Sequence, residues 1–185
     1  ALVVENANQH KQNPAFIEDA INTIDNSVKR MSNLLKKLQQ KQPSSSITFD
    51  IKKILIDAVK KCQSKNPRPS LRLNDASMMV TTDQDHLEMI FTHIIKNAQE
   101  ATDPSGFVDV TVYEKHGNAV IEVEDNGEGM DSDFIKNRLF RPFDTTKSGK
   151  GMGIGVYQTR EFIRSLGGDV AVHSTPKVGT VFKIT

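Results

Sequence analysis

Glu124-Asp125-Asn126-Gly127-Glu128-Gly129-Met130 follows two stretches, residues 107–114 and 119–124, in which apolar and polar residues alternate. This alternation is typical of half-buried β-strands, and the intervening His116-Gly117-Asn118 suits a hairpin turn because glycine and asparagine tolerate positive φ. The heptapeptide therefore begins where a strand ends. An aspartate fixed there can accept a hydrogen bond from an exocyclic amine, and glycines spaced by one residue let the backbone pass close to a flat ligand. These residues are therefore candidates for binding a flat ligand with an amino group, and the alternative is a glycine turn with a capping aspartate.

An amphipathic helix that carries one unusual amide is predicted before the hairpin. Asp83 or Asp85 can begin it, and its inward face is formed by Leu87, Ile90, Phe91, Ile94, Ile95 and Ala98. Asn97 lies beside this apolar row, where a side-chain amide would need a partner if buried. Its oxygen is a hard ligand suited to Mg²⁺, and His93, four residues earlier, shares its helix face. A surface asparagine and a partly buried histidine are the alternative.

A glycine-rich loop precedes the last predicted helix, residues 156–166. The loop is Gly149-Lys150-Gly151-Met152-Gly153-Ile154-Gly155. Backbone amides freed by glycine, together with the unpaired donors of a helix N-terminus, form an anion site, and Lys147 and Lys150 add positive charge. The loop lacks the Gly-Lys-Ser/Thr ending of a Walker loop and does not lie between two parallel strands as a Rossmann turn does. It is interpreted as a phosphate-binding loop, with a simple linker as the alternative.

The remaining pattern indicates an α+β sandwich. A helix capped by Asp50 buries one face, formed by Ile51, Ile54, Leu55, Ala58, Val59 and Cys62. Short strands are predicted at 47–49, 71–73, 78–81, 169–173 and 180–185. The stretch between the hairpin and the last helix is predicted to be irregular. Helices on one face of a mixed sheet would bury all of these apolar faces.

The N-terminal part of the chain carries a heptad pattern. Between Pro14 and Gln42 the apolar residues are spaced alternately by four and three positions, at Ile17, Ile21, Ile24, Val28, Met31, Leu35 and Leu38. Such a narrow stripe calls for a partner helix, the alternative being an arm packed on its own domain. Residues 1–11 are interpreted as the end of an earlier helix, broken at Asn13-Pro14. The predicted organisation is a partial helical hairpin at 1–42, a linker and first strand at 43–49, and a main domain at 50–185.

Composition excludes several classes of function. The 185 residues carry 24 Lys and Arg against 23 Asp and Glu, so the net charge of +1 provides no field to recruit nucleic acid or an anionic membrane. The single cysteine, Cys62, forms no internal disulfide, which favours a cytoplasmic location. No apolar run approaches the length of about 20 residues that a membrane helix needs. We therefore expect a soluble piece without nucleic-acid or membrane contact, which leaves open a membrane-anchored parent protein.

The order of the motifs resembles that of sensor histidine kinases. The Asn97 helix, the Asp125 glycine turn, the segment Leu139–Lys147 and the glycine loop resemble their N, first glycine, F and second glycine boxes, and Gly179-Thr180 is similar to the last glycine box. The resemblance covers roughly Phe49 to Thr185. The segment Leu139–Lys147, which resembles the lid of these kinases, also looks like the Phe-x-Pro-Phe-x-Thr-Thr-Lys motif of a group that includes kinases of PEP-CTERM sorting systems.

This resemblance implies a Bergerat-type ATP-binding sandwich, with a mixed sheet and about three helices on one face, preceded by a helical hairpin or coiled-coil arm. The fold is shared with DNA gyrase, mismatch-repair ATPases and heat-shock chaperone ATPases. By the same resemblance, Asp125 would bind the adenine amino group, Gly127 and Gly129 would open the base pocket, and Thr180 would support the adenine through its hydroxyl or a water.

The resemblance also implies a Mg-ATP site. Asn97 would coordinate Mg²⁺, Lys147 would reach the terminal phosphate, and Phe140 and Phe143 would hinge the lid. The loop that wraps the phosphates would be formed by Gly149, Lys150, Gly151, Met152 and Gly153. His93 departs from the Asn or Glu often found at its position in the family. A neutral imidazole there can still ligate a metal or orient a neighbouring group, so His93 is kept as a catalytic candidate.

The implied reaction is phosphoryl transfer from Mg-ATP to a histidine on a helical hairpin, then to an aspartate on the receiver domain of a response regulator. The arm would form a homodimer. His10 is a poor acceptor candidate because it lacks an acidic neighbour and Pro14 follows closely, so the acceptor histidine is expected upstream of Ala1. The alternatives are a GHKL-type ATPase, with Glu100 or a glutamate replacing His93 as general base, and a nucleotide-binding scaffold without turnover.

Overall fold

The computed structural model describes residues 13–39, 46–74, 76–144 and 153–185. The chain divides into two compact units, residues 1–44 and residues 45–185. The first unit contains helix α2 (Pro14–Gln39), and the second contains all other described elements. Among the described residues, no helix combines the length and the apolar character needed to cross a bilayer.

Helix α2 begins where the sequence places it. The side chain of Asn13 accepts a hydrogen bond from the backbone N–H of Ala15 at 3.1 Å, which satisfies one of the free donors of the first turn. The described part of its apolar stripe is exposed, with Ile17 at 43%, Ile21 at 60% and Ile24 at 57%. The predicted heptad helix is confirmed as a helix, and residues 1–11, the predicted end of an earlier helix, lie outside the described residues.

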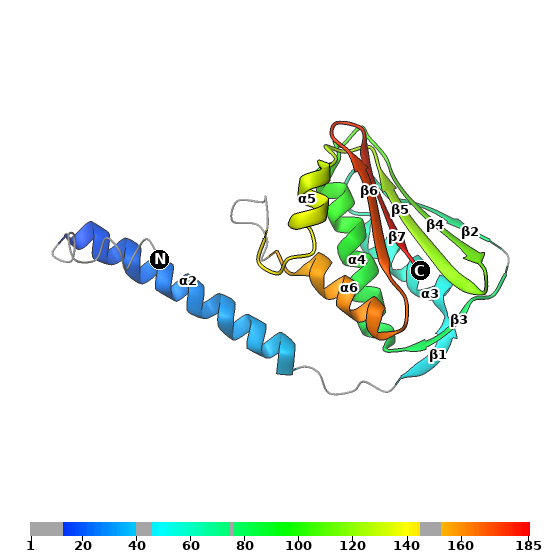
Figure 1. Cartoon of the computed structure of the whole chain (residues 1–185), viewed down its shortest axis with the longest axis horizontal. Coiled ribbons are helices and arrows are strands. Elements are labelled where there is room, and N and C mark those ends of the chain that lie inside the picture. Colours follow the sequence, from blue (N-terminus) through cyan, green and yellow to red (C-terminus); the bar gives the residue numbers. More distant parts are fainter. Residues whose placement is uncertain (1–12, 40–45, 75, 145–152) are drawn as a thin grey trace. The chain divides into compact units, whose positions relative to one another are not determined.

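The second unit is built on a five-stranded mixed sheet (Figure 1). Its strands in spatial order are β2 (Ser70–Leu73), β4 (Val108–Lys115), β5 (Asn118–Asp125), β7 (Gly179–Ile184) and β6 (Val170–Thr175). β2 runs parallel to β4, and every other neighbouring pair is antiparallel. The predicted hairpin is confirmed as β4 and β5, joined by a turn in which His116 and Gly117 have positive φ.

Helices cover one face of this sheet (Figure 1). They are α3 (Ile51–Cys62), α4 (Gln84–Ala101), the short α5 (Ser132–Asn137) and α6 (Gly155–Ser165). Asp50 caps α3 by accepting from Lys52 N–H, and Asp83 rather than Asp85 caps α4 by accepting from His86 N–H. The α5 helix lies in the stretch that the sequence predicts to be irregular.

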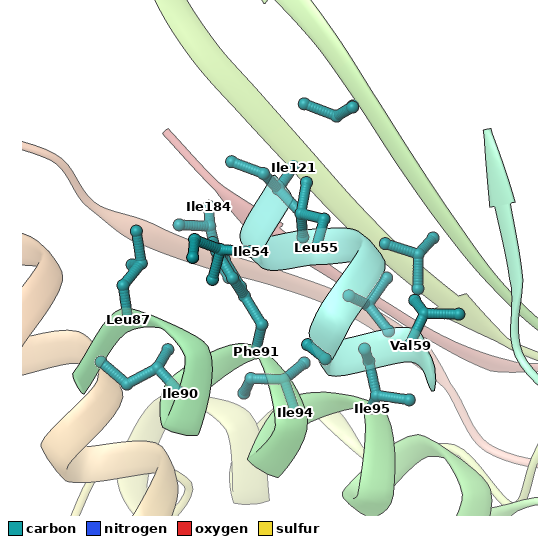
Figure 2. Close-up of a cluster of buried hydrophobic side chains, with 14 of the residues drawn as sticks. Ile54, Leu55, Val59, Leu87, Ile90, Phe91, Ile94, Ile95, Ile121 and Ile184 are labelled. Atoms are coloured by element: carbon teal, nitrogen blue, oxygen red, sulfur yellow. The ribbon is translucent and has the colours of Figure 1, made fainter. Parts of the chain in front are cut away.

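The core lies between the helices and the sheet (Figure 2). Figure 2 shows Ile54, Leu55 and Val59 of α3 and five labelled side chains of α4 directed towards Ile121 of β5 and Ile184 of β7. All of the residues predicted for the inward faces of α3 and α4 are buried. Helical periodicity identified these faces because each helix buries only one side.

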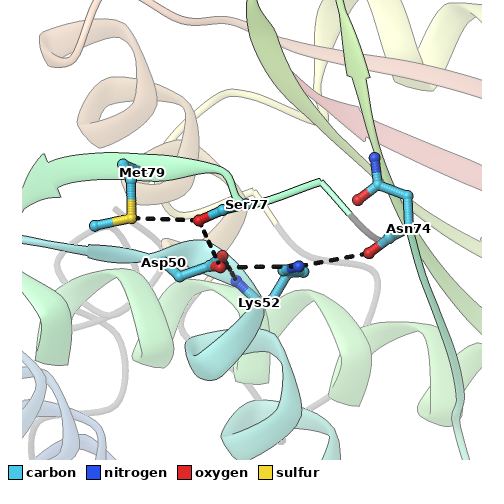
Figure 3. A network of polar contacts seen from close by, with 5 residues as sticks. All are labelled: Asp50, Lys52, Asn74, Ser77 and Met79. Atoms are coloured by element: carbon cyan, nitrogen blue, oxygen red, sulfur yellow. Dashed lines mark hydrogen bonds and ion pairs between the residues drawn. The ribbon is translucent and has the colours of Figure 1, made fainter.

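Strands β1 (Ile47–Asp50) and β3 (Met79–Thr82) form a separate two-stranded antiparallel sheet. A polar network ties it to the start of α3 (Figure 3). Ser77 donates to Asp50 at 3.1 Å, and Lys52 Nζ lies 3.5 Å from the carbonyl oxygen of Asn74. The α+β fold class is therefore confirmed, while the sequence pattern did not separate these two strands from the main sheet.

Candidate functional site

The ends of two neighbouring strands bring Asp125 and Thr180 together. Asp125 is the last residue of β5 and pairs in register with Thr180 near the start of β7. Both are buried, Asp125 to 4% exposure. Burial raises the pKa of the Asp125 carboxyl above its ordinary value, although the backbone N–H groups of Gly127 and Thr180 donate to it and oppose the shift. The sequence identified both residues, but only the sheet places them side by side.

The glycine turn after Asp125 is held against two backbone segments. A Cβ on Gly127 would overlap the carbonyl of Ala101, the last residue of α4, and a Cβ on Gly129 would overlap the carbonyl of Thr175. Glu128 N–H donates to the same Ala101 carbonyl at 2.9 Å. Glycine is thus required here by close contact with the protein's own backbone. The contact with Ala101 also fixes Asp125 relative to the helix that carries Asn97.

Ser174 is a residue of this region that sequence reasoning missed. Its hydroxyl accepts from Met130 N–H at 2.8 Å, donates to the Gly179 carbonyl at 2.8 Å, and lies 2.9 Å from the Thr180 hydroxyl. It therefore links the glycine turn to the start of β7. A lone serine just after a predicted strand gives no signal for such a role, because Met130 lies 44 residues away along the chain.

Asn97 and His93 contact one another on α4. Asn97 Nδ2 lies 2.9 Å from His93 Nε2, and both side chains are half-buried. The amide on this helix face was expected to need a partner, and His93 provides one. The ring of His93 also occupies the space beside Gly155, the first residue of α6, where a Cβ would overlap its Nε2. The side chain of His93 therefore connects Asn97, the candidate metal ligand, to the start of α6.

Phe140 and Phe143 have different environments. Phe140 is half-buried, packs against the core and lies under the guanidinium of Arg160 at 4.3 Å. Phe143 is 64% exposed, has a φ of 68°, and donates its backbone N–H to the Gly153 carbonyl at 2.9 Å. The two ends of the segment between residues 144 and 153 are thus bonded to each other. Arg160, on α6, was not singled out from the sequence.

The other predicted phosphate-site residues lie outside the described part of the chain. They are Lys147, Gly149, Lys150, Gly151 and Met152. Gly153, at the end of the loop, has a positive φ of 64°, and a Cβ there would lie 2.6 Å from the carbonyl oxygen of Asp144. Only the far end of the predicted phosphate loop is therefore described.

Among the described residues, the candidate metal ligand is the side chain of Asn97. No group of three or more His, Cys, Asp or Glu side chains that could hold a metal occurs among them. A single amide oxygen, such as that of Asn97, fits a Mg²⁺ ion that takes most of its ligands from substrate phosphates and water.

Known proteins with similar sequences and structures agree with this arrangement. The family model described as "Histidine kinase-, DNA gyrase B-, and HSP90-like ATPase" matches residues 82–185. Sporulation kinase A of Bacillus subtilis (strain 168) is 38% identical over 109 residues, which are 59% of this chain and 18% of that protein. The chain spans about a third or less of the length of such curated relatives.

Solved structures share the fold. Full-length ShkA in complex with AMPPNP has a TM-score of 0.67 and 22% identity, covering 76% of this chain and 30% of that one. Histidine kinase ThkA in complex with response regulator protein TrrA has a TM-score of 0.65 and 18% identity, covering 99% of this chain and 55% of that one. Since the family model matches more than half of the residues and contains both the Asn97 helix and the Asp125 turn, the chain belongs to the histidine kinase-, DNA gyrase B- and HSP90-like ATPase family.

Proposed function

We propose that the chain is the catalytic, ATP-binding part of a two-component sensor histidine kinase, with one helix of its dimerisation hairpin. The observation that carries the proposal is the joint placement of a buried carboxylate, Asp125, at the end of β5 and of the Asn97 amide on the adjoining α4. The contact between the glycine turn and Ala101 connects the two. The family match and the kinases it resembles give the reaction class.

Asp125 is proposed to recognise the adenine base. A carboxylate with little solvent exposure is a strong hydrogen-bond acceptor for an exocyclic amino group. Thr180, paired with Asp125 across the strands, supports the same end of the pocket through its hydroxyl. The turn that contains Gly127 and Gly129, held close to Ala101 and Thr175, is proposed to form one wall of the pocket.

Asn97 is proposed to supply an oxygen ligand to Mg²⁺ held between the protein and the nucleotide phosphates. When bound, the ion neutralises phosphate charge. Because one protein oxygen alone is a poor site, we expect Mg²⁺ to bind together with the nucleotide and not before it. Lys147 and the loop Gly149–Gly153 are proposed to hold the phosphates.

The phosphoryl group is proposed to pass from ATP to a histidine of the helical dimerisation hairpin, and then to an aspartate of a response-regulator receiver domain. The resemblance to a kinase solved with a response regulator supports the kind of partner. The exposed isoleucines of α2 support dimerisation through this helix, because a one-sided apolar stripe needs a partner. The unit is proposed to work in the cytoplasm, as a whole protein or as part of a membrane-anchored sensor.

The test is nucleotide binding by the 185-residue chain, measured by calorimetry with AMPPNP in the presence of Mg²⁺ or of EDTA. We expect binding that Mg²⁺ strengthens. Asp125→Asn should weaken it roughly ten- to hundredfold, since a buried hydrogen bond to a charged group contributes about 1.5–3 kcal/mol. Asp109→Asn, at a half-buried position of β4 where the carboxylate pairs with Arg72 of β2, is the control and should bind normally. No binding at millimolar AMPPNP would refute the proposal.

Kinase activity needs a second measurement. A longer version of the protein that includes the preceding hairpin helix should acquire an acid-labile phosphate on histidine when given γ-labelled ATP and Mg²⁺. The 185-residue chain alone should remain unlabelled, and label on His10 would show that it contains its own acceptor. Hydrolysis of ATP without any phosphohistidine in the longer protein would favour the ATPase alternative.

A further inference from the structure

The imidazole of His93 contacts two parts of the candidate site that are distant in the sequence. Its Nε2 lies 2.9 Å from Nδ2 of Asn97, one turn farther along α4. The same nitrogen lies where a Cβ on Gly155 would be, at the beginning of α6. One ring therefore separates the proposed magnesium ligand from the helix that follows the glycine loop.

The chemistry of the first contact fixes the orientation of the Asn97 amide. In the orientation seen here Asn97 presents its amide nitrogen, which can only donate, so this contact requires the tautomer of His93 that accepts at Nε2 and carries its proton on Nδ1. Asn97 then turns Nδ2 towards His93, which leaves Oδ1 on the other branch of the amide. Only Oδ1 is a ligand for a hard cation, since the N–H groups repel it.

The contact with Gly155 restricts the position of the His93 ring. α6 begins at Gly155 and presents no side chain towards α4 at this position, so the ring fits closely against the helix backbone. Any larger residue at 155 would displace His93 from its place beside Asn97. The orientation of the Asn97 amide is thus coupled to the position of α6.

We propose that His93 is a positioning residue that orients Asn97 towards the nucleotide-bound cation, and that Gly155 is required because the His93 ring occupies the site of its Cβ. The inference rests on the proposed function, because Asn97 acts there through Mg²⁺. His93 itself needs no contact with the cation or the nucleotide. It acts by accepting one N–H of Asn97, which prevents the amide from presenting its nitrogen end to the metal.

The first experiment measures the ratio of AMPPNP affinities with Mg²⁺ and with EDTA in the 185-residue chain. His93→Leu keeps similar bulk but removes the acceptor, and it should lower this ratio roughly three- to tenfold, as expected for one lost hydrogen bond. The affinity in EDTA should stay the same because the Asp125 pocket is untouched. His93→Asn restores an acceptor oxygen and should recover the ratio.

The outcomes separate this inference from the proposed function. Equal weakening of binding with and without Mg²⁺ in His93→Leu, or an unchanged ratio, would overturn the positioning role. A wild-type affinity that does not respond to Mg²⁺ would instead refute the metal assignment of the proposed function. Thermal unfolding of each variant identifies any that fails to fold.

The coupling to α6 is tested by Gly155→Ala in two backgrounds. In the wild type the added methyl group should displace the His93 ring. It should lower the ratio of AMPPNP affinities with Mg²⁺ and with EDTA about as much as His93→Leu does. In the His93→Asn background, where the side chain is smaller, the same change should have little further effect. Equal losses in both backgrounds would contradict the contact between ring and glycine.

A measurement on the unaltered protein completes the test. Nitrogen-15 NMR of the histidine side chains in nucleotide-free protein should show the proton of His93 on Nδ1 and an unprotonated Nε2. A proton on Nε2 would mean that Asn97 presents Oδ1 to His93, and the proposal would be wrong.

Discussion

At the scale of single residues, Asp125 carries opposing demands of stability and binding. Its side chain is nearly inaccessible, and burial raises its pKa above the ordinary 3.8, with the charge of Glu124 acting in the same direction. The N–H groups of Gly127 and Thr180 offset only part of this effect. A buried carboxylate of this kind lowers the stability of the protein when no nucleotide is bound. It suits a pocket in which the ligand provides a hydrogen-bond donor.

The raised pKa of Asp125 predicts how stability changes with pH. A carboxyl with a higher pKa in the folded than in the unfolded chain binds protons preferentially when folded, so its contribution to the free energy of unfolding grows as pH falls through the folded pKa towards 3.8. Asp125→Asn lacks this contribution. Urea unfolding at a series of pH values should therefore show the wild type gaining stability relative to Asp125→Asn as the pH decreases.

Nucleotide affinity should change in the opposite direction over the same pH range. The ionised carboxylate is the stronger acceptor for the adenine amino group, so AMPPNP affinity of the wild type should fall as Asp125 becomes protonated. A stability difference between wild type and Asp125→Asn that is independent of pH would contradict the raised pKa.

At the scale of elements, α6 and the segment before residue 145 meet through Arg160. Its guanidinium lies 4.3 Å from the centre of the Phe140 ring, and its Nε, which is buried, makes no hydrogen bond within the described residues. Asp169 is 3.8 Å from that Nε. Arg164, one turn later on α6, donates to the same carboxylate at 2.9 Å. The stack on Phe140 is thus the feature that distinguishes Arg160 from its neighbour.

We expect Arg160→Ala to loosen this segment more than Arg164→Ala does. The backbone N–H of Phe143, which donates to Gly153, should exchange with solvent at least about two- to fivefold faster in Arg160→Ala, because a cation–π contact contributes about 0.5–1 kcal/mol at an exposed site and more where it is partly buried, as here. Hydrogen exchange measured by mass spectrometry or NMR provides the comparison. Equal rates in the two variants would show that the ion pairs with Asp169, and not the ring contact, position α6.

At the scale of the whole molecule, the two units differ in how they are stabilised. The buried core belongs to residues 45–185, beginning with Phe49. The described side chains of α2, by contrast, are largely exposed, including Ile17, Ile21 and Ile24. The larger unit therefore contains its own core, whereas the apolar stripe of α2 needs a partner helix.

Removing residues 1–44 tests this division. The remaining protein should unfold cooperatively with a midpoint within about 2 °C of the whole chain and bind AMPPNP equally well, because it keeps the core and the described site residues. Self-association of the whole chain, measured by analytical ultracentrifugation, should be lost on truncation. Ile21→Glu in the whole chain should weaken association similarly. A dimer that persists in residues 45–185 would place the interface in that unit.

Local patterns in the sequence determined most of the elements. The inward faces of α3 and α4, the cap Asp50 and the hairpin ending at Asp125 follow from periodicity and capping, which depend on residues a few positions apart. The sequence left the cap of α4 open between Asp83 and Asp85, and the structure selects Asp83. The short α5 was missed because six residues are too few to show a helical period. The ordered motifs also identified Asp125, Asn97 and Thr180 as candidates, without their distances or partners.

Tertiary structure alone decided which distant residues meet. Three contacts join segments that the sequence treats separately: the His93 ring against Gly155, the hydrogen bond between Ser174 and Met130, and Arg160 over Phe140. Each depends on how α4 and α6 pack on the sheet that contains β6 and β7, and no local pattern encodes the resulting distances. The sequence by itself thus determined the elements and the chemical types at the site, and packing determined how those groups are oriented, because orientation is set by neighbours that the chain brings together only on folding.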